Sequence, residues 1–419
     1  MSRRAVVTGL GVVAPTGIGL EDHWAATLRG RSVLGPLTRF DASRYPVRLA
    51  GQVPDFVTKE RVPSRVIPQT DHWTHLALAA TDLALDDADA RPADLPEYEM
   101  AVMTASSSGG VEFGQREIER LWRDGPRHVG AYQSIAWFYA ATTGQISIRH
   151  GMRGPCGVVV AEQAGGLDAI GQARRVLDEG ATFVVSGGTD APFSPYGLTC
   201  QISNGRLSES TDPKAAYRPF DGDAAGYVPG EGGAIVIVED ADAAARRGVS
   251  RVYGEIAGYA ATFDPPPGSD RPPTLRRAIE RALDDAGVPP ADVDVVFADA
   301  AGVPELDRRE AEAIGAVFGD HGVPVTAPKS MTGRMYAGSG PLDLVDALLS
   351  IRDGVIPPTV GVRRIPADYG IDLVRDLPRR VPVRTALLLA RGYGGFNAAL
   401  VVRAVPDAVA AADGTTVPR

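Results

Sequence analysis

Residues 158–173, VVVAEQAGGLDAIGQA, join a strand-like run of valines to a turn of small residues and the start of a helix. A turn that leads from a buried strand straight into a helix presents one side chain at the helix N-terminus, where backbone N–H groups and the helix dipole favour negative charge. A cysteine at that position would have a lowered pKa and would form an acyl-thioester. The residue at the turn here is Gln163, whose amide is not a nucleophile.

Strand-like runs and helical patterns alternate on both sides of this turn. The runs are short, rich in valine or isoleucine and bounded by Gly, Asp or Pro, as strands covered on both faces are. We expect such strands at residues 3–9, 99–105, 157–163, 181–188, 232–240, 293–300, 385–392 and 397–404. Amphipathic helices are predicted at residues 71–88, 167–180, 273–287 and 341–354. Alternation of this kind predicts a layered α/β fold.

One break in composition divides the chain. Residues 262–273, TFDPPPGSDRPP, predict a loop, and a second series of helix, strand, turn and helix follows it, which suggests an internal duplication. We predict an N-terminal half over residues 1–253 and a C-terminal half over residues 254–403. Residues 404–419, rich in alanine and proline, are expected to be a peripheral tail.

The composition argues against several classes of protein. The chain has 419 residues, of which 44% are hydrophobic and 23% charged, and its net charge is −9 at pH 7. An acidic surface disfavours non-specific binding to nucleic acid. No apolar run reaches the roughly 18 residues that a membrane-spanning helix needs. Gly and Pro interrupt residues 1–20, so this segment predicts a first strand rather than a signal peptide. We expect a cytoplasmic protein that binds neither nucleic acid nor a membrane.

The cysteines and histidines indicate no metal site. Cys156 and Cys200 form no CxxC motif, and we expect both to be buried as small apolar residues. Among the six histidines only His72 and His75 have a spacing that suits a metal ion, and a chance pair on one helix face is the simpler interpretation.

The segment GLGVVA, residues 9–14, fits the dinucleotide-binding fingerprint. Pro15 follows it at once, and the next predicted helix begins only near Glu21, with acidic residues at the end that should receive a pyrophosphate. A nicotinamide-dependent enzyme therefore stays only as an alternative, and we expect no cofactor.

Four segments carry a resemblance to a known family. Residues 154–173, 218–239, 328–343 and 392–401 look like the ketosynthase branch of the thiolase superfamily, and the similarity spans roughly residues 1–403. Gln at the turn, together with AWFYAATTGQISIRHGMRGP (136–155), resembles one group in that branch, the chain-length factor or ketosynthase β-subunit of aromatic, type II polyketide synthases. The resemblance implies a thiolase-like, layered αβαβα fold with two duplicated halves.

Within that family the catalytic set is Cys, His and His, and the resemblance maps those three positions to Gln163, Asp299 and Arg334. The resemblance also includes a polar lysine position beside that set, and Lys329 keeps the family's residue there. The usual carboxylate partner of this lysine maps to Asp343. We expect a Lys329–Asp343 pair. We also expect Asp299 and Arg334 to form a buried ion pair that closes the former pocket.

Those residue types do not support condensation. The reaction needs a thiolate to hold the acyl chain and neutral imidazoles to donate to a thioester carbonyl, whereas an ionised Asp cannot donate and Arg cannot act as a base. Two roles stay open for Gln163. It either fills the cysteine position as a structural plug, or its amide holds a malonyl thioester and assists decarboxylation for priming.

The resemblance further implies a heterodimer with a catalytic ketosynthase α-subunit, served by an acyl carrier protein that bears malonyl or polyketide chains. Product length would be set in a tunnel at the subunit interface. The gate positions of the family map to Val111, Gly114 and Ile118 in residues 109–126, which share one helix face. These side chains are small or medium in size, so we expect a long product, a decaketide or beyond, and a Phe at Gly114 or Val111 to shorten it.

Residues 131–145 concentrate Tyr132, Trp137, Phe138 and Tyr139, which predicts either core or a subunit interface near the tunnel. Two further functions remain as alternatives. In the first alternative the chain only stabilises its partner structurally. In the second it is an independently active condensing enzyme that uses another nucleophile. Cys156, seven residues before the turn, is poorly placed for that role.

Overall fold

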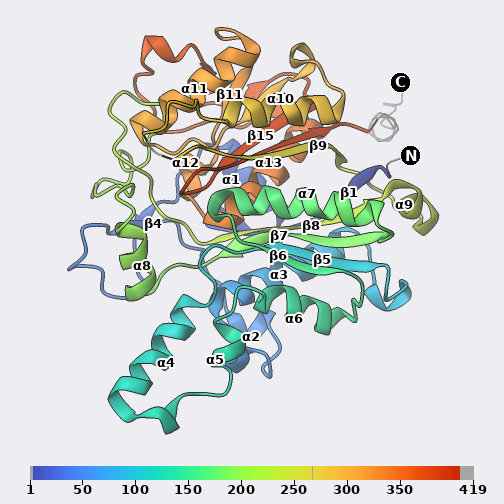
Figure 1. Cartoon of the computed structure of the whole chain (residues 1–419), viewed down its shortest axis with the longest axis vertical. Coiled ribbons are helices and arrows are strands. Elements are labelled where there is room, and N and C mark those ends of the chain that lie inside the picture. The colour runs from blue at the N-terminus through green and yellow to red at the C-terminus, as the bar shows by residue number, and fades with distance from the viewer. Residues whose placement is uncertain (1–2, 267, 406–419) are drawn as a thin grey trace, which may run out of the picture.

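The computed structural model describes residues 3–266 and 268–405 and consists of five stacked layers (Figure 1). Two layers of strands, which are hydrogen-bonded to each other at one point and so form one continuous 12-stranded sheet, alternate with three layers of helices. The fold is the predicted αβαβα arrangement, and the two sheets have matching internal order.

Most strands of the described residues fall into two series that pair in the same way, and the remaining short strands lie outside these series. Their bounds are β1 (Ala5–Ala14), β2 (Gly17–Ile18), β3 (Gly35–Pro36), β4 (Leu49–Ala50), β5 (Met100–Ala105), β6 (Cys156–Val159), β7 (Phe183–Asp190), β8 (Gly232–Asp240), β9 (Gly254–Phe263), β10 (Val295–Phe297), β11 (Pro324–Thr326), β12 (Val355–Ile356), β13 (Asp372–Leu373), β14 (Arg379–Arg380), β15 (Thr385–Arg391) and β16 (Phe396–Arg403).

The order β1-β8-β7-β5-β6 is repeated as β9-β16-β15-β10-β11, with β13 added beyond β11. In both series the first two contacts are antiparallel and the last two are parallel. Within the described residues the ladder that joins the two series consists of two residue pairs, Val6 with Glu255 and Val7 with Gly254. The chain is therefore built from two duplicated halves, as predicted.

The helices cover both sheets and separate them. Their bounds are α1 (Leu20–Leu28), α2 (Thr58–Arg61), α3 (His72–Asp87), α4 (Val111–Asp124), α5 (Gln133–Ala136), α6 (Ala141–His150), α7 (Gly165–Asp178), α8 (Pro195–Ile202), α9 (Ala241–Arg247), α10 (Leu275–Ala286), α11 (Pro304–Phe318), α12 (Lys329–Thr332) and α13 (Ser339–Asp353).

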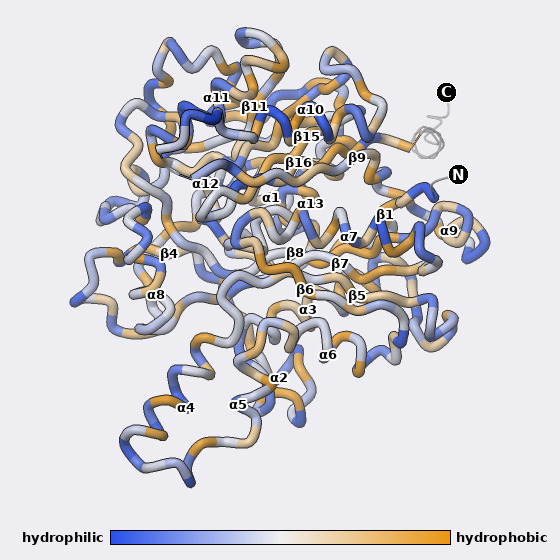
Figure 2. Tube along the Cα trace, viewed as in Figure 1, coloured by the Kyte–Doolittle hydropathy of each residue, from blue (hydrophilic) through white to orange (hydrophobic). Residues whose placement is uncertain are grey.

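The helices α7 and α13 form the middle layer, between the sheets, while α3 and α6 cover one outer face and α10 and α11 the other (Figure 1). Because α13 is covered on all sides, its first twelve residues are all buried. Figure 2 shows hydrophobic residues concentrated along the strands at the centre of the molecule. The core therefore lies on both sides of the middle layer, and the turn at Gln163 leads into it.

The segment GLGVVA lies inside β1 and is not a phosphate-binding loop. A Cβ atom at Gly9 or Gly11 would overlap the carbonyl oxygens of Ala84 and Ala80 on α3. These two glycines therefore let α3 pack closely on the strand. The dinucleotide-binding interpretation fails, because no helix N-terminus follows the segment in the position that the motif requires.

Helix α4 and the short helix α5 project from the body as an arm (Figure 1). Asp71, the N-cap of α3, accepts hydrogen bonds from the backbone N–H of Phe113 at 2.6 Å and of Trp73 at 3.4 Å, which ties the first turn of α4 to the body. The hydrophobic face of α4 is therefore presented at a fixed position, although most of the arm is surrounded by solvent.

The expected burial of the two cysteines is wrong. Cys156 and Cys200 are both exposed. Cys156 begins β6, which is the edge strand of its sheet, and Cys200 lies on α8, so neither is covered by another element of this chain.

No helix in residues 3–266 or 268–405 has the length and apolar character to span a bilayer. Most of the predicted tail, residues 406–419, lies outside the described residues.

Candidate functional site

Gln163 lies at a sharp turn between a strand and a helix. β6 ends at Val159, one 3-10 turn covers Glu162–Ala164, and α7 begins at Gly165. Glu162 has a φ of 51°, in the left-handed region that a residue other than glycine adopts only when its surroundings hold it there. The Gln163 side chain is 2% exposed. The turn predicted from the sequence is present, and the side chain that it presents is buried.

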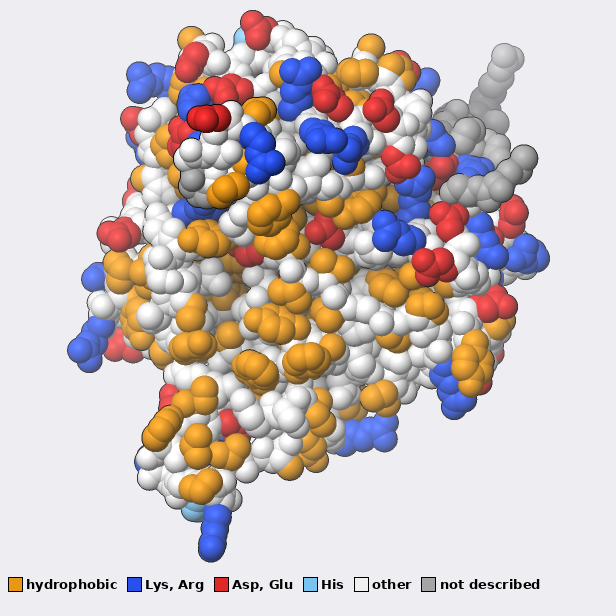
Figure 3. Space-filling view, in the orientation of Figure 1, with side chains coloured by type: hydrophobic (Ala, Val, Ile, Leu, Met, Phe, Trp, Pro, Cys, Tyr) orange, Lys and Arg blue, Asp and Glu red, His pale blue; other side chains and the backbone are white. Residues whose placement is uncertain are grey.

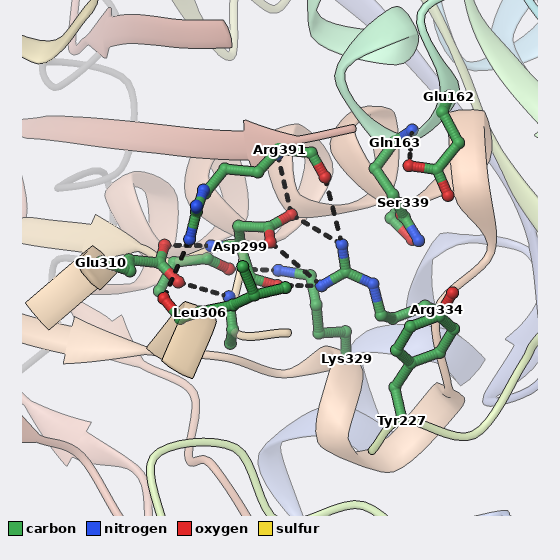
Figure 4. Close-up of polar contacts among 12 residues, drawn as sticks. Glu162, Gln163, Tyr227, Asp299, Leu306, Glu310, Lys329, Arg334, Ser339 and Arg391 are labelled. Atoms are coloured by element: carbon green, nitrogen blue, oxygen red, sulfur yellow. Dashed lines mark hydrogen bonds and ion pairs between the residues drawn. The ribbon is translucent and has the colours of Figure 1, made fainter. Parts of the chain in front are cut away.

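Asp299 and Arg334 form the predicted ion pair, and both are buried. The guanidinium donates to Asp299 Oδ1 at 2.9 Å and Oδ2 at 3.2 Å and to the Asp299 carbonyl oxygen at 2.7 Å. The backbone N–H of Arg391 donates to Oδ1 at 2.9 Å. Figure 4 shows Asp299 between Arg391 and Arg334, with the Tyr227 ring on the other side of Arg334, 5.1 Å from the guanidinium carbon.

Both members of this pair are charged at neutral pH. Burial raises the pKa of Asp299, but the neighbouring Arg334 guanidinium outweighs it, so the pKa of the carboxyl lies below its ordinary value. Burial lowers the pKa of Arg334, and the Asp299 carboxylate reverses this and raises that pKa well above its ordinary value. Neither group exchanges a proton near pH 7, as a general acid or base would.

The Gln163 amide completes the same network. In the orientation that satisfies both of its neighbours, its oxygen accepts from Arg334 Nε at 2.8 Å and its nitrogen donates to the Tyr336 carbonyl oxygen at 3.1 Å. Gln163, Arg334 and Asp299 are therefore connected in series, at the three positions that the resemblance assigned to Cys, His and His. One of the two N–H donors that the priming hypothesis needs is already used within the protein.

Lys329 and Asp343 form the second predicted pair. Lys329 Nζ lies 2.8 Å from Asp343 Oδ2, both side chains are buried, and the amine also donates to the Ala298 carbonyl. Burial raises the pKa of Asp343 to about 6, and the Lys329 charge opposes the increase. The carboxylate is therefore ionised at neutral pH, and the pair joins α12 to α13 beneath Asp299.

Sequence reasoning missed two carboxylates of the site. Glu310 on α11 accepts from the backbone N–H groups of Asp299 at 2.7 Å and Ala300 at 2.8 Å, and burial together with the Asp299 charge raises its pKa to about 7. Glu162 accepts from Gln163 N at 3.1 Å and Tyr393 N at 2.7 Å, and burial raises its pKa. Glu310 could have been identified from the sequence, because it is a charged residue on the apolar face of the α11 segment.

A cavity of about 460 Å³ remains beside the ion pair. It is lined by Glu162, Arg206, Tyr227, Arg309 and Tyr393, and Asp299 and Arg334 contribute to its wall. The expectation that the ion pair closes the pocket is therefore wrong. The pair replaces the reactive groups and leaves the adjoining space open, because its polar atoms bond to one another and to the backbone rather than across the cavity.

A buried carboxylate links this site to the base of the arm. Asp190 Oδ2 accepts from the backbone N–H of Ala337 at 2.9 Å, one residue after the partner of Gln163. Its Oδ1 accepts from the backbone N–H groups of Ser107 and Ser108, both at 3.1 Å. The loop that leads into α4 is therefore fixed to the segment that surrounds Gln163.

The three predicted gate residues lie on α4 in different environments. Val111 is half-buried, and its Cγ2 lies 3.2 Å from the place where Gly197 of α8 would carry a Cβ. Ile118 is 50% exposed and is therefore not part of the core of this chain. Gly114 is buried, and a Cβ there would lie 2.8 Å from Cδ1 of Trp137. The Trp137 indole therefore occupies the space beside Gly114.

The aromatic stretch is not core. Trp137 is 48% exposed and Phe138 52%, and Tyr132 is similarly accessible, while Tyr139 is half-buried. Exposed aromatic side chains in one short segment are characteristic of a surface that contacts another molecule.

Two family models together match most of the chain. One describes the beta-ketoacyl synthase N-terminal domain and matches residues 2–244, and the other describes the C-terminal domain and matches residues 253–363. A relative from Streptomyces coelicolor, named as a candidate beta-ketoacyl synthase 2 for the actinorhodin polyketide, is 60% identical over 95% of this chain and 98% of its own length. The tetracenomycin polyketide synthase ketoacyl synthase beta subunit of Streptomyces glaucescens is 57% identical over 95% and 98%.

Solved structures agree with these sequence matches. The ishigamide ketosynthase/chain length factor is similar with a TM-score of 0.87 and 28% identity, covering 97% of this chain and all of the other. A type II polyketide synthase acyl-carrier protein in complex with its ketosynthase bound to the hexaketide gives a TM-score of 0.86 at 28% identity, with the same coverage. With the duplicated halves and the Gln163 turn, these matches assign the chain to the beta-ketoacyl synthase family, in its branch of ketosynthase beta subunits, or chain-length factors, of type II polyketide synthases.

Proposed function

We propose that this chain is the non-condensing subunit of a heterodimeric type II polyketide β-ketoacyl synthase, in which it limits the length of the poly-β-ketone made by its catalytic partner. The observation that carries the proposal is the buried series Gln163–Arg334–Asp299, which leaves no thiolate and no imidazole at the turn. A condensing site requires both kinds of group. The chain therefore limits the space available to the growing product, while the partner carries out the condensation.

The surface of the chain supports a partner beside the edge strand. β6 ends its sheet with a free edge, and Cys156 at its start and Val160 just after its end are exposed. Figure 3 shows hydrophobic side chains gathered over the face that carries β6 and α4. An uncovered apolar edge strand is an aggregation hazard unless another chain covers it. We infer that the catalytic ketosynthase subunit covers β6, α5 and the exposed side of α4.

The position of α4 suits a length-limiting role. Val111 and Ile118 belong to α4, which this partner is proposed to cover, and the Asp190 contacts hold the base of the arm close to the Gln163 turn. A product that extends between the two subunits would meet this helix. The gate residues Val111, Gly114 and Ile118 stay a proposal, as does a long product, a decaketide or beyond.

The acyl carrier protein is proposed to dock mainly on the partner. One similar solved structure holds an acyl-carrier protein with its ketosynthase. This chain carries a net charge of −9, and carrier proteins of such systems are acidic, so electrostatic repulsion disfavours docking on this chain alone. The basic surface that attracts the carrier protein is then supplied by the catalytic subunit.

An exchange of subunits tests the proposed function. When this chain is co-expressed with the catalytic subunit and carrier protein of a synthase that makes a shorter product, we expect the product mass to follow this chain. If product length stays with the catalytic subunit while the complex forms normally, the chain is a structural stabiliser. Purified chain that condenses malonyl units without any partner would instead identify an independent condensing enzyme.

The two roles of Gln163 predict different results for Gln163→Ala. As a plug, the variant loses the contacts with Arg334 Nε and the Tyr336 carbonyl, and we expect the free energy of unfolding to fall by about 1–3 kcal/mol with priming by malonyl carrier protein unchanged. Chemical denaturation and the rate of acetyl-primer formation measure the two quantities.

The matched control is Gln69→Ala, because the Gln69 amide makes its one described contact, to the Arg65 carbonyl, in a half-exposed position. That change should alter stability by less than about 0.5 kcal/mol. Loss of priming in Gln163→Ala without loss of stability would contradict the plug and favour assistance of decarboxylation.

A further inference from the structure

The space beside Gly114 is occupied by a side chain from another part of the arm. A Cβ built on Gly114 would lie 2.8 Å from Trp137 Cδ1 and 3.5 Å from its Nε1. Contacts below 3.0 Å are closer than the van der Waals radii of the atoms allow, so no other residue fits there without movement of the indole. The glycine therefore seats the Trp137 ring against α4.

The backbone of Trp137 is fixed at the base of α4. Its carbonyl oxygen accepts from the Gly110 N–H at 3.1 Å. A Cβ on Gly110 would overlap the Ala136 carbonyl, and one on Gly109 would lie 2.9 Å from the Trp137 carbonyl oxygen. Gly109 and Gly110 thus allow the segment after α5 to pack against the start of α4. This packing fixes the position of the Trp137 Cα atom, from which the indole extends.

The indole itself is held by packing. In residues 3–266 and 268–405 no group accepts a hydrogen bond from Trp137 Nε1 at hydrogen-bonding distance, and the side chain is 48% exposed. The ring lies against Gly114, and Trp137 is exposed together with Phe138, the next residue, and Ile118, one turn after Gly114 on α4. The ring is therefore part of the same surface that the proposed tunnel would use.

We propose that Trp137 is a specificity-determining residue, whose indole forms the floor of the product chamber and limits the length of the chain. This inference rests on the proposed function. Gly114 then acts by admitting the indole rather than by leaving open space. The gate accordingly consists of residues from two segments, α4 and the turn after α5, instead of one helix face.

Removal of the Trp137 indole should leave a cavity beside Gly114 that the neighbouring residues do not fill. A large-to-small change opens a cavity only as far as the neighbours fail to fill it. Gly114, which lies against the ring, has no side chain that can move into the gap, and Gly109 and Gly110 contact only the backbone of the segment that carries Trp137. Trp137→Ala therefore enlarges the chamber, whereas a Phe at 137 fills part of the same volume.

The test uses the complete complex of this chain with a catalytic subunit and carrier protein, with product mass as the readout. In Trp137→Ala the main product should gain at least one ketide unit. Trp137→Phe, which keeps an aromatic ring at the surface, should shift a smaller fraction of the product in the same direction. Val111→Phe, on the neighbouring part of α4, should shorten the product.

Gly114→Ala supplies a coupling test. In the wild-type background its methyl group must displace the indole, so the distribution of product lengths should change. In the Trp137→Ala background the same substitution meets no indole and should have a smaller effect, since residues in contact give non-additive results.

The outcomes separate this inference from the proposed function. Wild-type product length in both Trp137 variants, together with a shorter product from Val111→Phe, would overturn the role of Trp137 and leave the proposed function intact. Unchanged length in all three variants, and in the subunit exchange, would overturn both. Should Trp137→Ala fail to form the complex, Trp137→Phe decides the question.

Discussion

Arg334→Ala should lower the free energy of unfolding by about 3–5 kcal/mol, the range seen when one member of a buried ion pair is removed. The reason is the environment of Asp299, which is buried and would keep its charge without the guanidinium that now donates to both carboxylate oxygens. Gln163 would also lose the partner of its amide oxygen. The midpoint of chemical denaturation of the purified complex measures the change.

Two further variants identify the cause of that loss. Arg334→Met combined with Asp299→Asn removes both charges and keeps an acceptor for the Arg391 N–H, so most of the lost stability should return. Arg276→Ala breaks an exposed pair with Glu280 on α10 and should cost less than about 0.5 kcal/mol. A loss in Arg334→Ala no larger than that of Arg276→Ala would contradict a structural role for the buried pair.

Phe138→Asp should weaken the complex with the catalytic subunit by a factor of at least about 30, which corresponds to the 2 kcal/mol or more of an aromatic interface hot spot. Phe138 is 52% exposed and lies beside Trp137 in the apolar surface of the arm. A carboxylate there would have to be desolvated when the partner binds. Co-purification and titration of the two subunits measure the loss.

Leu377→Asp is the matched control. Leu377 is an exposed leucine that follows β13, the strand at the opposite end of the sheet order from β6. The control should leave the complex intact. Equal weakening by both substitutions, or by neither, would contradict the proposal that the partner covers β6, α5 and α4.

Much of the fold could be predicted from the sequence, because buried strands of a layered α/β protein are local apolar runs. All eight predicted strands are present, from β1 to β16. β9 was missed because its sequence GEIAGYAATF is rich in small residues, and a Cβ on Gly258 would overlap the Ala282 carbonyl on α10. β11 and β13 have three and two residues, which is too short for a periodic signal.

The candidate site was predicted less completely, because much of it depends on tertiary contacts. The pairs of Arg334 with Asp299 and of Lys329 with Asp343 follow from the resemblance and are confirmed. The contact between Trp137 and Gly114 joins residues 23 positions apart across a turn, and no local pattern indicates it. The division at residues 253 and 254 and the roles of the gate residues stay predictions.

The series Gln163–Arg334–Asp299 also constrains how this subunit can change over evolutionary time. The single change Arg334→His would leave the buried Asp299 carboxylate without the guanidinium that now pairs with it, although the other two positions would still lack the groups that condensation needs. A cysteine at 163 alone would remove the acceptor of Arg334 Nε and would meet a guanidinium instead of an imidazole. A single change at one of the three positions is thus penalised by the other two residues, so a Cys, His and His set could be reached only by changing all three together.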